Sequence, residues 1–420
     1  MNAILTGADG FLARYADLRD RLPGDLHARD EAAKAFRRAG LPGRRVEAWK
    51  YTDLRPIASG AFHEPLDQHT DCAALLARAP HIDGARLVFV DGRFRNDLST
   101  LPAAARFTRF ADDPSFGALA RPEREQMVAL NTMLAEDGAG IEVPENTDAG
   151  LIHLVSLATD TPHGAADFHP RHRIRLAPGA TLTVLETSLG DGTYLHAPVT
   201  ELHVAEGASL THIRLQDEST AAFHLSTLYA EIAARGTYDS FALNLGGRMA
   251  RTEVHARLTG PGAVTHLNGA QLLSGTQHAD FTTVVRHDAP HGTSRQTVKN
   301  VLAGRSRGVF QGRIEVARQA QKTDGYQMSQ SLLLSPDAEI DTKPELEIFA
   351  DDVKCSHGAT VGELDAEQLF YLRSRGIPDT EARSMLVRAF LAEALDAVTH
   401  ETARAVLEAA VEGWWQRQAA

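Results

Sequence analysis

The segment Ile174-Arg175-Leu176-Ala177-Pro178-Gly179-Ala180-Thr181-Leu182-Thr183 decides the fold, because the chain repeats its order of strand, glycine turn and strand. A clear copy is Leu202-His203-Val204-Ala205-Glu206-Gly207-Ala208-Ser209-Leu210-Thr211, and weaker copies follow it. The turn glycines recur about every 28 residues, a period typical of solenoids; they are Gly179, Gly207, Gly236 and Gly262. Since the units contain strands and no helical spacing, the repeat predicts a β-helix whose corner glycines supply positive φ. A β-sandwich with evenly spaced turns is the alternative that the pattern leaves open.

The expected β-helix core covers residues 151–362, because short strand-like runs continue as far as Val353-Lys354-Cys355. Residues 1–150 are expected to form an N-terminal helical region with a small hairpin. Apolar residues between Ala28 and Ala39 fall on one helical face. The run Leu87-Val88-Phe89-Val90 followed by Asp91-Gly92 predicts the hairpin. A further helix is predicted from Pro122 to Leu134.

Residues 363–420 are expected to form a C-terminal helical region. Asp365 and Gln368 have the spacing of a capping box, and Gly376 with Pro378 is a stop signal for that helix. The last apolar stripe ends at Trp414 and has near-ideal helical spacing, which indicates a helix packed on its own domain. The Trp414-Trp415 pair could also anchor an interface.

The composition fits a globular protein and argues against several classes of partner. The 420 residues are 43% hydrophobic and 23% charged, with a formal net charge of -12 that disfavours nucleic acid. The sequence has no apolar run of membrane-spanning length and no signal-peptide pattern, so a cytoplasmic location is expected. It has no phosphate-loop or dinucleotide motif, so any ATP would be hydrolysed by another subunit. The 19 histidines, many between His153 and His291, are expected to be scattered over surface and core.

Cys355 and His357 form the most chemically informative pair. In a strand, residues i and i+2 point to the same face with Cα atoms about 7 Å apart. A thiol and an imidazole suit a soft metal, and Asp351 and Asp352 are close enough to hold the imidazole. The other cysteine, Cys72, lies in a helical context and is expected to be structural. Two ligands do not complete a metal site, so any such site is shared, transient or not cluster-like.

Other interpretations of these residues stay open at this point. Cys355 could be a small buried hydrophobe and His357 a turn residue. A nucleophilic Cys-His dyad is conceivable, although no third orienting group follows from the spacing. A carbohydrate-active β-helix enzyme could use Asp280, Arg286 and Asp288. A homodimeric metal-binding protein could bring His357 from two copies together.

Several ordered motifs together resemble the SufB/SufD family, whose members are scaffold proteins of the SUF iron–sulfur cluster assembly system. The resemblance is dense over about residues 285–395 and rests on Gln311-Gly312-Arg313-Ile314, Ala320-Gln321-Lys322-Thr323-Asp324, Leu332-Leu333-Leu334-Ser335, Lys343-Pro344-Glu345-Leu346-Glu347-Ile348, Cys355-Ser356-His357-Gly358-Ala359-Thr360 and Gln368-Leu369-Phe370-Tyr371. Near the N-terminus, Glu47-Ala48-Trp49-Lys50-Tyr51-Thr52 is similar to the signature of the SufD branch. SufB-like sequences are expected to have a cysteine at the position of Leu372. The leucine in this chain therefore also points to the SufD branch.

The resemblance implies a mainly β fold, with a right-handed parallel β-helix core flanked by α-helical N-terminal and C-terminal regions. It implies a non-enzymatic scaffold subunit that pairs with SufB through the β-helices and binds the SufC ATPase through its C-terminal helical region. The helices from about Pro378 to Leu395 and at the C-terminus are expected to carry that contact. His357 is the first expected metal ligand and Cys355 the second, shared with SufB at the interface. A transient iron–sulfur cluster is expected there and none on the isolated chain, which could form a homodimer when alone.

Overall fold

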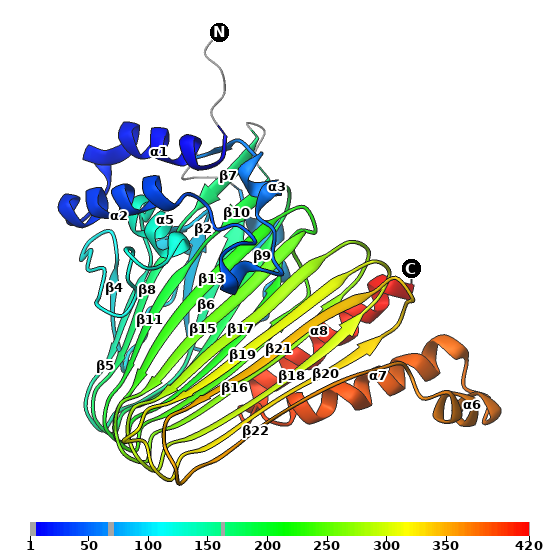
Figure 1. The fold of residues 1–420 in the computed structure, drawn as a ribbon. Helices are drawn as coiled ribbons and strands as arrows, with labels where there is room; N and C mark the ends of the chain where they lie inside the picture. Colours follow the sequence, from blue (N-terminus) through cyan, green and yellow to red (C-terminus); the bar gives the residue numbers. More distant parts are fainter. Residues whose placement is uncertain (1–5, 66–70, 161–163, 420) are drawn as a thin grey trace.

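A parallel β-solenoid fills most of the computed structural model, which describes residues 6–65, 71–160 and 164–419 (Figure 1). Each coil contributes one long strand to each of two sheets, and from β11 onward strands adjacent in the sequence alternate between the sheets. Eight consecutive parallel strands stack in sheet A: β5 (Ala139–Val143), β8 (Arg171–Leu176), β11 (Val199–Val204), β13 (Phe223–Ile232), β15 (Met249–Leu258), β17 (His278–His287), β19 (Arg307–Val316) and β21 (Glu339–Ile348). The predicted parallel β-helix is thus confirmed, and the β-sandwich alternative is wrong.

Sheet B stacks in the same order, and its last strand ends at the predicted residue 362. Eight of its parallel strands in the described ranges are β6 (Asp148–Ala158), β9 (Thr181–Gly190), β12 (Ser209–Asp217), β14 (Thr237–Asn244), β16 (Val264–Leu273), β18 (Thr293–Leu302), β20 (Asp324–Leu333) and β22 (Lys354–Gly362). Both sheets begin with strands that precede residue 151, so coils stack continuously across that expected boundary.

The seven corners that lead from sheet A to sheet B between β5 and β20 each place one residue in the left-handed region. The predicted glycines do so at Gly179, Gly207 and Gly262, with φ of 68°, 65° and 69°. The prediction is wrong for Gly236, because Arg235 takes this conformation with φ 54° and Gly236 has no positive φ. The backbone N–H of each corner residue donates to a carbonyl of the next corner, as in Arg235 N to Pro261 O at 3.0 Å. These bonds satisfy corner groups that the sheets leave unpaired.

The N-terminal region packs on the outer face of sheet A. The predicted hairpin is present, with β2 (Ala85–Val90) and β3 (Arg93–Phe94) antiparallel, and β2 also extends sheet B beside β6. Buried apolar residues of the helices contact β10 and β13. The remaining elements are α1 (Gly7–Leu18), η1 (Arg19–Arg21), α2 (Leu26–Ala39), η2 (Glu47–Trp49), α3 (Arg55–Ala58), β1 (Phe62–His63), α4 (Ala73–Arg78), η3 (Asn96–Leu98), β4 (Arg106–Arg109), α5 (Gln126–Leu134), β7 (Ala165–Phe168) and β10 (Tyr194–His196).

Helix α5 begins at Gln126, so the predicted start at Pro122 is wrong. Its C-terminal end is fixed by the buried Arg29 of α2, whose guanidinium donates to the carbonyls of Thr132, Met133 and Ala135 at 2.7–3.1 Å. Carbonyls in the last turn of a helix have no partner within the helix, so this arginine joins α2 to α5.

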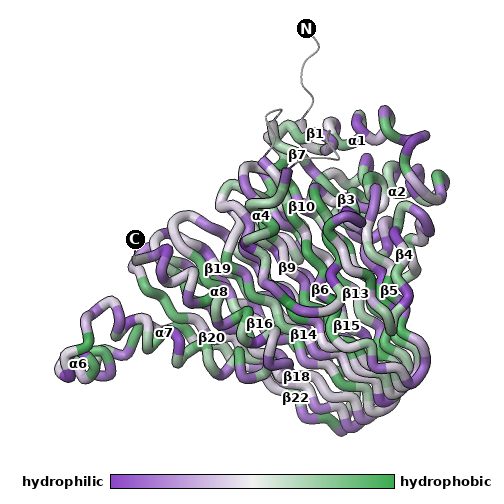
Figure 2. The backbone as a smooth tube through the Cα atoms, turned by 180° about the vertical axis from the view of Figure 1, so that it is seen from behind, coloured by the Kyte–Doolittle hydropathy of each residue, from purple (hydrophilic) through white to green (hydrophobic). Residues whose placement is uncertain are grey.

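The C-terminal helices lie against the outer face of sheet B (Figure 2). Helices α7 (Asp379–Leu395) and α8 (Glu401–Ala419) bury Leu391, Leu407 and Trp414 against strands from β9 to β20. Trp414 is buried, as the packing interpretation predicted. Helix α6 (Ala366–Ser374) is capped by Asp365, which accepts from the backbone N–H of Glu367 and Gln368, but it buries no residue and projects from the solenoid (Figure 1). No helix within the described ranges combines the length and apolar character needed to cross a membrane.

Candidate functional site

The last coil leaves one end of the solenoid open. Among the described strands, β21 pairs only with β19 and β22 pairs only with β20, so each is the edge strand of its sheet. Edge strands present unpaired backbone donors and acceptors that can pair with another chain. β21 carries charged residues and a proline, which discourage such pairing, whereas β22 exposes Val361.

Cys355 and His357 lie on β22 and share one face, as strand alternation predicts. The register stacks Cys355 on Gly325 and His357 on Gln327 of the preceding coil. Gln327 and the residue below it, Gln296, are completely buried, whereas His357 is exposed. His357 thus occupies a position that is buried in the two preceding coils. It is exposed because no described coil follows β22.

The Cys355 thiol faces the core of the last coils. It packs beside Ile314 and Val316, and its Sγ lies next to Gly325. Burial raises the pKa of the Cys355 thiol, while a hydrogen bond with the Gly325 backbone acts in the opposite direction. The thiol is therefore protonated at neutral pH until a metal or a neighbouring cation stabilises the thiolate.

The imidazole of His357 has no hydrogen-bond or ion-pair partner in the described part of the chain. Below it, Gln327 Nε2 donates to the carbonyl of Glu345 at 3.2 Å, and the buried Gln327 Oε1 has no partner among the described groups. Gln296, Gln327 and His357 therefore form a polar column along sheet B, and His357 is its last member at the open end.

Gly312, one of the residues behind the family resemblance, makes room for this column. A Cβ at Gly312 would collide with Gln327 Oε1 and would lie 2.7 Å from Phe310 Cζ. The glycine is needed here because side chains of the opposite sheet fill the interior, and its φ is not positive.

The expected role of the neighbouring carboxylates is wrong for Asp352. Its side chain pairs with the Lys322 ammonium, and its backbone N–H donates to Gln321 Oε1 at 3.0 Å. Both contacts fix the corner between β21 and β22, so Asp352 does not hold the imidazole. Cys72 is buried at the start of α4 in a different apolar cluster from Cys355, in agreement with a structural role.

The residues considered for a carbohydrate-active enzyme do not converge. Asp280 lies near the start of β17, buried under Arg251 and Thr52. Asp288 follows the end of the same strand, where it pairs with Arg257 and Arg286 at the corner. Eight residues of strand separate the two carboxylates by about 26 Å, too far for one catalytic site.

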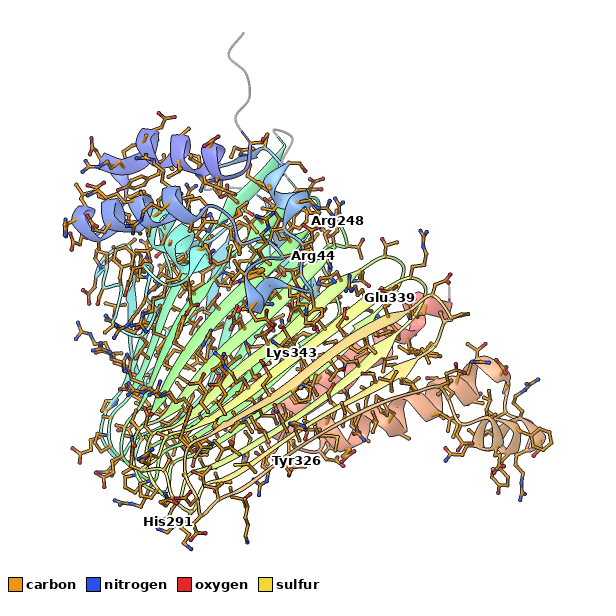
Figure 3. All side chains as sticks on the ribbon, in the orientation of Figure 1. Arg44, Arg248, His291, Tyr326, Glu339 and Lys343 are labelled. Atoms are coloured by element: carbon orange, nitrogen blue, oxygen red, sulfur yellow. The ribbon has the colours of Figure 1, made fainter. Side chains whose placement is uncertain are left out.

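The Glu47–Thr52 motif, for which the sequence analysis predicted no structural role, binds the outer face of sheet A. Trp49 is buried and stacks over the Arg251 guanidinium at 4.2 Å. The carbonyl of Ala48 accepts from Gln311 Nε2 at 3.1 Å, and Glu47 pairs with Lys343 on β21 at 2.5 Å. Figure 3 shows Lys343 on this face near the segment that carries Arg44. The motif thus joins the N-terminal region to the open end of the solenoid.

Helix α6 carries a second exposed surface. Phe370 and Tyr371 are 73% and 57% exposed, among the most exposed apolar side chains in the described ranges. They line a groove of about 810 Å³ together with Leu372 and Leu386. Large apolar residues gathered on a projecting helix are typical of a binding surface.

Comparison with known proteins identifies the family. A family model described as "SUF system FeS cluster assembly, SufBD core domain" matches residues 158–390. The chain is 36% identical over 374 residues to the iron–sulfur cluster assembly protein SufD of Escherichia coli, covering 87% of each sequence. It is 32% identical over 402 residues to a SufBD family protein of Synechocystis, covering 89% of this chain and 87% of that protein. It is 30% identical over 387 residues to the chloroplastic protein ABCI7 of Arabidopsis thaliana, covering 88% and 81%.

The matched region contains most of the solenoid and its open end. The family model and the relatives agree with the motifs in the sequence, and the chain belongs to the SufBD family of SUF iron–sulfur cluster assembly proteins.

Proposed function

We propose that this chain is a SufD-like, non-catalytic scaffold subunit that pairs with a SufB-like partner through the open end of its solenoid. A nascent iron–sulfur cluster is assembled between the two chains as their shared cargo. The proposal rests on the position of His357. Its register matches buried residues of the earlier coils, but no further coil covers it in the described part of the chain. The identity to a SufD protein over most of both sequences supports the assignment to that branch.

His357 and Cys355 supply this chain's share of the ligands. Imidazole and thiolate bind iron, and a complete cluster site normally has four ligands, mostly thiolates. Cys355 and Cys72 belong to separate apolar clusters, so this chain offers the site one thiol. The partner must supply the other ligands, and the isolated chain is expected to hold no stable cluster.

A SufC-like ATPase subunit is expected to dock on α6 and the adjoining part of α7. The family resemblance implied a contact on the helices from about Pro378 to Leu395 and at the C-terminus, but the apolar faces of α7 and α8 pack on sheet B. Phe370 and Tyr371 remain exposed, so we place the contact there. ATP hydrolysis by that subunit would move the helical region and open the paired solenoids, a coupling of two conformational states. The cytoplasm remains the proposed location.

The test is coexpression of the tagged chain with SufB-like and SufC-like partners, followed by measurement of complex composition, iron and acid-labile sulfide. We expect cluster in the complex and not on the isolated chain, which could instead form homodimers through the same end. Val361→Glu places a charge on the β22 edge and should reduce capture of the SufB-like partner, because burying an unpaired charge in an interface is costly. The matched control is Leu101→Glu, since Leu101 is 52% exposed and Val361 is 54% exposed. Unchanged capture by the Val361 variant would refute the proposed interface.

A further inference from the structure

Two histidines and a glutamate meet inside the solenoid, away from its open end. His196 on β10 lies in register with His224 on β13, one coil later. Glu218 reaches them from the turn that follows β12. All three residues are buried, with 1%, 6% and 3% exposure for His196, His224 and Glu218. The strands that carry the histidines lie together near the N-terminal helices (Figure 1).

The ligand atoms of the three side chains have the spacing of one metal site. One nitrogen from each histidine and a carboxylate oxygen lie within 4.8 Å of one another. Glu218 Oε1 is 3.0 Å from His196 Nδ1, and Glu218 Oε2 is 2.7 Å from His224 Nδ1. Two ligands at right angles about a metal, each with a bond of about 2.1 Å, are separated by about 3 Å.

The contact between Glu218 and His224 is not a well-formed hydrogen bond. Although the atoms are 2.7 Å apart, His224 Nδ1 is buried and has no properly aligned acceptor among the described groups. His196 Nε2 is likewise buried without a partner. Buried polar atoms are almost always satisfied, so His224 Nδ1 and His196 Nε2 can each accept a further partner that the described groups do not supply.

Glu218 brings a buried negative charge to the cluster. Within the described ranges, Glu218 forms ion pairs only with His196 and His224. Gln216 Nε2 donates to it at 3.0 Å, and the Tyr194 hydroxyl also contacts it. A buried carboxylate requires a nearby positive charge. A divalent cation would provide it, while the two imidazoles contribute neutral donor atoms.

The backbone holds Glu218 in place. Gly247 N donates to the Glu218 carbonyl at 3.2 Å, and Gly246 N donates to Gln216 Oε1 at 3.1 Å. A Cβ at Gly246 would collide with the backbone N and O of Glu218. On the other side, the ring of Phe168 packs against His196 with centroids 4.7 Å apart. Such support fixes ligand geometry before a metal arrives.

A second cluster of similar composition lacks these properties. Glu125, Glu253 and His255 also lie within 4.8 Å of one another on the outer face of sheet A. There, Arg251 donates to Glu253 Oε2 at 3.0–3.1 Å, and the Tyr229 hydroxyl donates to Glu125. Both carboxylates already have partners, so this cluster serves as a control.

We propose that His196, Glu218 and His224 form a binding site for one divalent first-row transition-metal ion, Zn²⁺ or Fe²⁺. Two histidines and one carboxylate with open positions are a ligand set that both ions accept. The site lies within a single chain and does not depend on the open end or on the proposed partners.

The test uses the full-length chain, stripped of metal with a chelator that is then removed. The background is the Cys355→Ala/His357→Ala variant, so that metal bound at the open end is excluded. We expect one equivalent of Co²⁺, used as an optical probe, to bind with d–d bands and no thiolate charge-transfer band. Zn²⁺ and anaerobic Fe²⁺ should displace it, and their competition shows which ion binds more tightly.

His196→Gln, Glu218→Gln and His224→Gln should each weaken binding at least about tenfold, since each removes a direct ligand. His255→Gln is the matched control and should leave the affinity unchanged. Circular dichroism checks the fold of each variant. Should Glu218→Gln fail to fold, His224→Gln decides the question, because His224 is the most exposed of the three residues. The proposal is overturned by the absence of stoichiometric binding, or by binding that survives His224→Gln.

Discussion

Trp49→Ala tests how the N-terminal motif stabilises the solenoid. Trp49 is 6% exposed and covers Arg251, a buried arginine paired with Asp280 and Glu253. Replacing a buried tryptophan with alanine costs about 3–5 kcal/mol in the free energy of unfolding. Of this, about 1–2 kcal/mol is the cation–π contact with a desolvated guanidinium. Trp49→Phe keeps a ring over Arg251 and should cost about 1–2 kcal/mol.

The assay is urea unfolding followed by circular dichroism, combined with hydrogen exchange of the peptide covering residues 44–55. We expect faster exchange in that peptide and in β15 and β17, because water reaches the Arg251 network once the indole is removed. Tyr51→Ala is the matched control in the same motif, since Tyr51 is only half-buried. The reasoning is refuted by a Trp49→Ala protein that unfolds within about 1 kcal/mol of the wild type and shows unchanged exchange.

Three further predictions concern other parts of the molecule. Gly312→Ala should displace the Gln327 amide and lower cluster yield in the complex without preventing its assembly, as checked by iron content and gel filtration. Replacing both Phe370 and Tyr371 with serine should abolish capture of the SufC-like subunit but not of the SufB-like one, as measured by pull-down. Burial lowers the pKa of His287 from 6.5 to about 4. The unfolded chain therefore binds a proton at this histidine at a higher pH than the folded chain does, and the free energy of unfolding falls as the pH drops from 6.5 to 4. That loss amounts to about 3 kcal/mol, and His287→Gln should reduce it in urea titrations at each pH.

The repeat carried most of the information about the fold. Spaced turn glycines predicted the stacked coils, and Asp91-Gly92 predicted the β2–β3 hairpin, whose turn residues have φ of 49° and 80°. The error at Gly236 arose because a coil corner needs one left-handed residue but does not need glycine there, and Arg235 accepts that conformation. Local patterns also could not show that β2 joins sheet B, because that pairing depends on contacts distant in the sequence.

The sites were predicted less completely, for reasons of topology. Alternation along a strand was enough to put Cys355 and His357 on one face, but not to show that the solenoid ends there without a cover. The histidines were expected to be scattered, yet His196 and His224 are one coil apart and therefore stack. The spacing of the two histidines predicts that they stack only when it is compared with the period of the repeat. Glu218 comes from a turn, whose position the repeat does not determine.

A shared cluster site at the open end is best tested by the cluster content of the three-protein complex carrying His357→Ala. His81→Ala is the matched control, since His81 is exposed and precedes β2. Both variants should assemble with the SufB-like and SufC-like partners in the same ratio as the wild-type chain. We expect only the His357 variant to lose iron and acid-labile sulfide. Wild-type amounts of both in the His357→Ala complex would contradict a shared site at the open end of the solenoid.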